Sequence, residues 1–197
     1  MRTVTLDAAA SPEARALLNS MLARSQDALR AALAGDRVAT DRALDTAMEA
    51  YDAYRAHVVT AHPMACREGC TACCHDNPRG VTGIEIARLR EVATVEEIAR
   101  FRALAARGEA QETWRARREP CPFLVEGRCR VYARRPIACR AFYALTPPNQ
   151  CDPGDPRYEE RVNPHLDPPQ IVVQILRAIS RTLALGEDAD LHAGIGR

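Results

Sequence analysis

The stretch Cys66-Arg67-Glu68-Gly69-Cys70-Thr71-Ala72-Cys73-Cys74 places four cysteines within nine residues of a 197-residue chain. Thiolates this close together are stabilised by a bound cation, so the spacing favours a metal site. If the stretch is helical, these positions bring the four sulfurs to within roughly 100° of one face of the helix. The stretch therefore predicts a region in which several sulfurs gather around a metal.

Four more cysteines follow at longer intervals, so only the tertiary fold can bring them close to one another. We expect all eight to be metal ligands: Cys66, Cys70, Cys73, Cys74, Cys121, Cys129, Cys139 and Cys151. Neighbouring side chains tend to diverge, so the adjacent Cys73 and Cys74 suit two ions or a polynuclear centre better than one tetrahedral ion. The expected cofactor is zinc or iron, with an iron–sulfur cluster as one form of the iron centre.

Composition excludes several classes of function. The 27 basic residues, all arginine, face 26 acidic ones, which leaves a net charge of +1. This balance argues against a nucleic-acid partner or a polybasic membrane surface. The absence of lysine excludes Schiff-base chemistry and a phosphate-loop lysine. No stretch approaches the ~20 apolar residues of a membrane span, so we expect a soluble, cytoplasmic protein whose cysteines are reduced, with a disulfide scaffold as the alternative.

Apolar periodicity predicts a mainly α fold with three regions. Residues 1–62 are expected to form an N-terminal helical hairpin, residues 63–155 a cysteine-cluster core, and residues 156–197 a proline-rich wrap and a C-terminal helix. Capping boxes predict helices after Thr82 and Thr94. A glycine turn within 121–132 predicts a short β-hairpin.

Three smaller expectations concern the connecting segments. A short helix is predicted for residues 109–118, around Trp114. Prolines concentrated between Pro147 and Pro169 predict an extended wrap. The last ten residues are expected to be frayed.

Polar neighbours of the cysteines are candidate parts of the site. His62 and His75 flank the first cluster, but solvated loop histidines are the favoured interpretation. Zinc held by four thiolates carries a formal charge of about −2. Arg134, Arg135 and Arg140 are therefore candidates for donating hydrogen bonds to sulfur, with a solvated arginine face as the alternative.

The combined pattern resembles a known family. The residues that carry the resemblance are Cys66 to Cys74, followed by Cys-Pro-Phe-Leu, Gly-x-Cys and Val-Tyr-x-x-Arg-Pro-x-x-Cys-Arg within 121–140. This order is similar to the CxxxCxxCC cysteine-cluster family of zinc- or iron-chelating domains. The resemblance implies cysteine ligands for zinc or iron. Some relatives, the flagellin lysine N-methylases, carry a similar cluster in a larger enzyme.

Two functions therefore stay open. The first is a metal-binding protein that uses its eight cysteines for structure, storage, delivery or partner recognition. The second is an iron–sulfur redox or group-transfer enzyme related to the flagellin lysine N-methylases. The sequence favours the first, because no separate substrate-binding or general-base motif stands out. It does not identify catalytic residues, a substrate or a protein partner.

Overall fold

The structure is a computed structural model that describes residues 2–5, 11–61, 69–75, 78–108, 113, 117–141, 148–151, 155–157, 162–165 and 170–197. For residues 2–5, 59–61, 148–149 and 162–165 the backbone alone is described. Cys66, His62 and Trp114 lie outside the described residues, as does most of the predicted helix at 109–118. No helix in the described ranges combines the length and the apolar character needed to cross a membrane.

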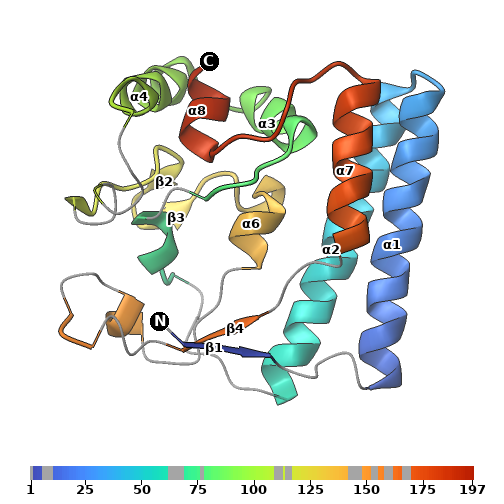
Figure 1. Ribbon diagram of the computed structural model, residues 1–197, viewed down its shortest axis with the longest axis horizontal. Helices are drawn as coiled ribbons and strands as arrows, with labels where there is room; N and C mark the ends of the chain where they lie inside the picture. Colours follow the sequence, from blue (N-terminus) through green and yellow to red (C-terminus); the bar gives the residue numbers. More distant parts are fainter. Residues whose placement is uncertain are drawn as a thin grey trace.

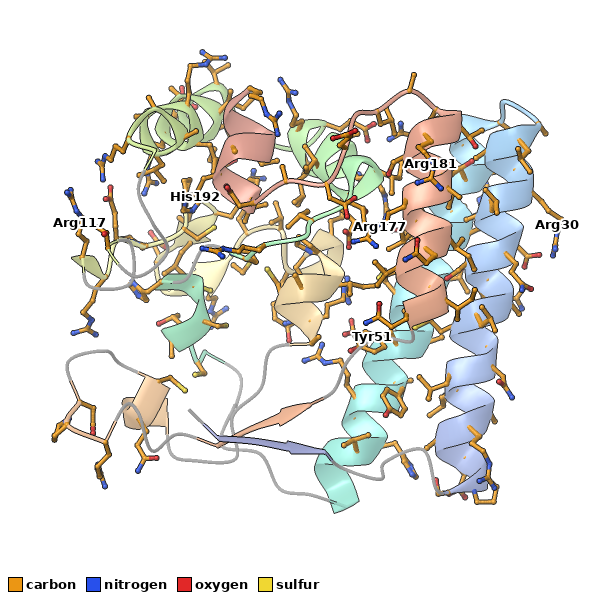
Figure 2. The ribbon with its side chains drawn as sticks, viewed as in Figure 1. Arg30, Tyr51, Arg117, Arg177, Arg181 and His192 are labelled. Carbon is orange, nitrogen blue, oxygen red and sulfur yellow. The ribbon has the colours of Figure 1, made fainter. Side chains whose placement is uncertain are left out.

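Three long helices lie side by side and form one half of the molecule (Figure 1). They are α1 (Pro12–Leu33), α2 (Arg37–Ala61) and α7 (Gln170–Thr182). The predicted helical hairpin and C-terminal helix are confirmed. Their apolar faces share one core, which includes Met21, Leu44, Tyr51, Ile175 and Ile179. Arg30 extends from the outer face of α1, away from this core (Figure 2), and its side chain is 68% exposed.

Local signals set the ends of the first helix. The hydroxyl oxygen of Ser11 accepts a hydrogen bond from the Ala14 N–H at 3.0 Å, and Pro12 occupies the first helical position. Beyond the last turn, Gly35 has a φ of +74°, a conformation that glycine adopts without strain. The chain can therefore reverse between α1 and α2.

A second half is built from shorter helices: α3 (Gly83–Arg90), α4 (Val95–Ala106) and α8 (Leu191–Gly196). Thr94 and Glu97 form the predicted capping box at the start of α4, through hydrogen bonds of 2.8 and 3.2 Å. The buried apolar residues here include Val81, Ile86, Leu89, Phe101, Phe123 and Ile195. Phe123 comes from the cysteine region, so this core reaches the predicted metal site.

The expectation of a frayed C-terminus is wrong, because α8 packs against α4 and its Leu191 and Ile195 are buried. Asp190 caps the helix by accepting from the Ala193 N–H at 2.8 Å. Close approach explains its two glycines. A Cβ on Gly194 would stand 2.5 Å from Ile86 Cδ1, and one on Gly196 would stand 2.8 Å from the carbonyl oxygen of Phe101.

The proline-rich segment also contains more regular structure than expected. Within it lie η4 (Pro148–Cys151), a 3-10 helix, and β4 (Val162–His165). The latter pairs in parallel with β1 (Arg2–Thr5), with Arg2 opposite Val162 and Thr5 opposite His165. The composition of the segment gave no indication that its backbone pairs with a strand far away in the sequence.

In the view of Figure 1 the cysteine region lies below α3, α4 and α8 and to the left of the long helices, and its described residues form short elements. These are η2 (Ala72–His75), β2 (Leu124–Val125), β3 (Arg128–Cys129), η3 (Tyr132–Arg134) and α6 (Ile137–Arg140). β2 and β3 form the predicted antiparallel hairpin. The division of the chain at residues 62 and 155 remains a prediction, although Ile84 and Ile137 join the core of the long helices.

Substitution of two leucines tests whether α8 is part of the core. We expect Leu191→Ala to lower the free energy of unfolding by about 2–4 kcal/mol, because Leu191 is 3% exposed and its loss leaves a cavity. Leu33→Ala is the matched control, since Leu33 is 69% exposed and its loss should change little. Urea unfolding of the reduced protein, followed by circular dichroism, measures both. Equal stability of the two variants would mean that α8 is not part of the core.

Candidate metal centre

Seven of the eight predicted ligands lie in the described residues, and they come from several short segments. Cys73 and Cys74 are in η2, with Cys70 two residues before it; the others are Cys121 before β2, Cys129 at the end of β3, Cys139 in α6 and Cys151 at the end of η4. None of Cys70, Cys73, Cys74, Cys121, Cys129 and Cys139 takes part in a disulfide bond, and each is half-buried.

The first cysteine segment is not one continuous helix. Gly69 has a φ of +79°, which lies in the left-handed region, and the helical turn begins only at Ala72. The helix-face argument for four sulfurs therefore does not apply to this stretch. Tertiary contacts bring the sulfurs together instead.

Two contacts join this segment to later cysteines. The Cys121 N–H donates a hydrogen bond to the carbonyl oxygen of Cys74 at 2.7 Å. The η2 turn also packs against η4, which contains Cys151. Segments about 50 to 80 residues apart in sequence are thus held at one place.

Four thiols act electrostatically on one another, and we call them the inner set: Cys73, Cys121, Cys129 and Cys139. The Cys73 charge raises the pKa of the other three, and the charges of Cys121 and Cys129 raise that of Cys139. Coulomb interactions of this kind are felt in a poorly screened environment. The four thiols, which come from four separate segments, therefore share one electrostatic environment.

Burial is the main reason why the inner set resists ionisation in the absence of a cation. It raises the pKa of Cys121 to about 12, and it also raises those of Cys129 and Cys139. For Cys73 the largest cause is a hydrogen bond with the Cys74 thiol, followed by burial. A metal ion stabilises the thiolate form and reverses this preference.

Cys73 and Cys74 are adjacent in the η2 turn, and Cys74 raises the pKa of Cys73 through a hydrogen bond and through its charge. Among the described residues, no group of three or more cysteine, histidine, aspartate or glutamate side chains already has metal-binding geometry. We therefore expect the cysteine side chains to rotate when a metal binds. The thiols are half-buried and lie in or beside short elements, so their side chains have room to rotate.

The α6 helix, which contains Cys139, is fixed at both ends by carboxylates from other helices. At its start, Glu85 Oε1 accepts from the Ile137 N–H at 2.7 Å, while Oε2 accepts from the N–H and hydroxyl of Thr82 at 2.9 and 2.8 Å. At its end, the buried guanidinium of Arg140 donates to Asp52 of α2. The two carboxylates therefore fix the position of the helix that contains Cys139.

Sequence reasoning missed the role of these two carboxylates. The Thr82–Glu85 capping box was recognisable, but its additional bond to Ile137 links residues 52 positions apart. Asp52 and Arg140 are separated by 88 positions. Glu85 is followed by Ile86, and Asp52 lies between Tyr51 and Ala53, so no local pattern indicated a distant partner.

The three arginines predicted to face sulfur have different roles. Arg140 donates to oxygen: besides Asp52, it binds the carbonyl groups of Arg135 at 2.9 Å and Ala133 at 2.5 Å. Arg134 lies 3.7 Å from a Glu91 carboxylate oxygen. Of these three arginines, Arg135 is the one whose charge lowers the pKa of thiols in the inner set, those of Cys73 and Cys129; outside the three, Arg130 also lowers that of Cys129 and Arg100 that of Cys121. The prediction is therefore wrong for Arg140, whose donors face oxygen.

His75 has one nitrogen occupied. Its Nδ1 lies 2.7 Å from the carbonyl oxygen of Arg118, so Nδ1 carries the proton and donates. The remaining Nε2 has the lone pair that a metal ligand needs. A loop histidine outside the ligand set stays the favoured interpretation of His75, with a ligand role as the alternative.

Removal of the Asp52 charge tests the link between α2 and α6. Burial opposes ionisation of Asp52, but Arg140, Arg55 and Arg135 outweigh it and hold its pKa below the ordinary value. We expect Asp52→Asn to lower the free energy of unfolding at neutral pH by about 2–3 kcal/mol, less than for a fully buried pair because Asp52 is partly exposed. Asp27→Asn, which removes an exposed partner of Arg24 and Arg30, should change little.

The lowered pKa of Asp52 also determines how its contribution to stability changes with pH. Because the pKa of Asp52 is lower in the folded state, its contribution is present above the unfolded value of about 4 and is lost as the pH falls through the folded value. The difference between wild type and Asp52→Asn should therefore shrink in acid. A constant difference from pH 7 to pH 2 in urea unfolding would contradict this account.

The raised thiol pKa values predict that metal binding releases protons. Near pH 7 the inner set is protonated, so ligation displaces up to about four protons per metal and the affinity rises with pH. Titration of reduced protein with Zn²⁺ in weak buffer containing an indicator dye measures the release. Protein alkylated with iodoacetamide is the control. Binding without proton release would show that the thiols are not the ligands.

A comparison with family models gives an independent result. Residues 65–161 match the CxxCxxCC family, described as "Putative zinc- or iron-chelating domain". No curated protein and no solved structure matches the chain. The match includes all eight cysteines and supports the resemblance inferred from their spacing. Residues 65–161, just under half of the chain, thus match the model of the CxxCxxCC family.

Proposed function

We propose that the protein is a metal-binding module that holds zinc or iron through cysteine thiolates. The inner set supplies the first four ligands, and Cys66, Cys70, Cys74 and Cys151 supply further ones. The single observation that carries the proposal is the convergence of cysteine segments far apart in sequence: the Cys121 N–H donates to the Cys74 carbonyl oxygen at 2.7 Å, and η2 packs against η4, which contains Cys151. A zinc- or iron-chelating family description for the same region supports metal as the common partner.

A bound metal gives this region the order that its elements lack alone. The β2–β3 hairpin has two residues in each strand, and an isolated hairpin of any length is marginal in water. Ligation by Cys121, Cys129 and Cys139 would link the two ends of this hairpin to α6. The binding free energy of the metal would then act as folding free energy for the whole segment.

The acidic groups around the cysteines favour a binding role over catalysis. Glu85 is engaged by three donors, and Asp52 is engaged by arginines. Neither carboxylate is therefore free to act as a general base. We propose a cytoplasmic location for the same protein, since a reducing compartment keeps the thiols competent to bind metal.

One observation favours a second candidate, an iron–sulfur redox or group-transfer enzyme. Cys73 and Cys74 are adjacent in η2, and two neighbouring thiols suit two iron atoms of one cluster. Such a cluster would supply electron-transfer chemistry. The choice between the candidates depends on the metal.

Anaerobic purification followed by metal analysis and a visible absorption spectrum distinguishes them. A colourless protein with one or two zinc ions supports the structural module. Brown protein with iron and acid-labile sulfide near cluster stoichiometry supports the enzyme. A protein that retains neither metal, and that binds neither Zn²⁺ nor Fe²⁺ after reduction, contradicts both.

Substitution within α6 tests the inner set directly. We expect Cys139→Ser to lower the metal bound per chain at limiting metal concentration by at least about tenfold, because a hydroxyl does not replace a thiolate ligand. Ala138→Ser is the matched control: it adds a hydroxyl to the neighbouring residue and keeps all the thiols. Equal metal content in the two variants would exclude Cys139 as a ligand.

A further inference from the structure

Three guanidinium groups meet at one carboxylate where α2 lies against α6. Arg55 Nη1 lies 2.6 Å from Asp52 Oδ1, and Arg135 Nη2 lies 3.5 Å from the same oxygen. Arg140 Nη1 donates to the other oxygen, Oδ2. The side chains of Arg55, Arg135 and Arg140 are 8%, 13% and 2% exposed. We call these three arginines and Asp52 the arginine cluster, in which one carboxylate is shared by three cations.

A second group of buried charges has a different balance. The Arg88 side chain is 7% exposed; its Nε lies 3.2 Å from Asp41, and its Nη2 donates to Asp45. Arg37 pairs with Asp41 at 2.8 Å and with Glu91 at 2.6 Å. Each of these two arginines therefore contacts two carboxylates. Such compensation matters because the protein interior screens charge poorly, and the arginine cluster has the opposite ratio.

Arg135 has the donors of the cluster that suit a further acceptor. Its Nε and Nη2 form the edge of the guanidinium with two parallel N–H groups, which match two oxygens of a carboxylate or phosphate. Asp52 meets Nη2 only at the outer limit of hydrogen-bond distance. Nε is buried and has no hydrogen-bond acceptor among the described residues. A buried donor without an acceptor is costly, so this edge favours an anion.

The Arg135 guanidinium is held in place before an anion arrives. It stacks on the ring of Tyr132, with Cζ 3.8 Å from the ring centroid, so one face of the plane is covered. Its own carbonyl oxygen accepts from Arg140 Nε at 2.9 Å, which fixes the backbone before α6. Solutes can reach the cluster, because the side chain of Asp52 is 38% exposed and Tyr132 is 58% exposed. An anion therefore binds to a group that is already ordered.

We propose that the arginine cluster is a binding site for a small oxyanion, the carboxylate or phosphate group of a ligand, which accepts hydrogen bonds from Nε and Nη2 of Arg135. Arg55 and Arg140 add positive charge at the same place, and the anion supplies the negative charge that Asp52 divides among three cations. The inference goes beyond the proposed metal-binding function, because its contacts join guanidinium and carboxylate groups and involve no thiol.

Calorimetric titration of the full-length, reduced protein tests the site. Inorganic phosphate and acetate are the two probes, each titrated at constant ionic strength set with sodium chloride. We expect a dissociation constant of about 1 mM for at least one probe, which is within reach of ligands with so few atoms. Binding of phosphate alone indicates a phosphate-bearing ligand, and binding of acetate alone indicates a carboxylate. If neither probe binds, the proposal is wrong, whether or not the protein binds metal.

Two adjacent arginines provide the matched variants. Arg135→Gln removes the charge and the paired donors, so we expect the affinity for the probe to fall about tenfold or more. Arg134→Gln removes a charge from an arginine whose described ion pair is with Glu91, and its affinity should stay within about twofold of wild type. Wild-type affinity in Arg135→Gln, or equal losses in both variants, would overturn the proposal.

A third variant keeps the test decisive if Arg135→Gln does not fold. Asp52→Asn removes the carboxylate that competes with the anion for Arg135 and repels it. We therefore expect this variant to bind the probe more tightly than wild type, by about threefold or more. A cluster that serves only to join α2 to α6 would give no such gain. Unchanged or weaker binding by folded Asp52→Asn protein would contradict the assignment.

Discussion

The buried guanidinium of Arg140 joins the cysteine region to the long helices. Moving a guanidinium out of water costs several kcal/mol, and this cost is offset only where its donors find acceptors and its charge finds a partner. Asp52 supplies the charge, and the carbonyl groups of Ala133 and Arg135 supply the remaining acceptors. Because Arg140 follows directly after Cys139, the same interactions that satisfy the cation determine where one of the inner thiols lies.

The opposite end of the same short helix is held in a complementary way. Glu85 places a carboxylate at the start of α6, where backbone N–H groups are unpaired, and Arg140 places a cation at its end. A four-residue helix has little stability of its own, so α6 is stabilised by these tertiary contacts and not by its helix propensity. Cys139 therefore lies on an element that is fixed at both ends, whereas Cys73 lies in the η2 turn, Cys121 before β2 and Cys129 at the end of β3.

Sequence reasoning succeeded where structure depends on nearby residues. Ser11 with Pro12, and Thr94 with Glu97, determine helix starts through side chains within four positions, and the apolar periods of α1, α2 and α7 identify their buried faces. It failed for α8, because two glycines in six residues argue against a helix until Ile86 and Phe101 are known to need that space. The cysteine pattern identified the family, but the contacts among the inner set depend on pairing between segments far apart, which spacing alone does not determine.

The central claim is that sulfurs from four separate segments hold one metal centre, and X-ray absorption at the edge of the bound metal tests it most directly. The account predicts a first shell of four sulfur neighbours at about 2.3 Å from zinc in the fully loaded protein, with loss of one sulfur in Cys139→Ser. A first shell dominated by nitrogen or oxygen, or one that is unchanged by the serine substitution, would contradict it.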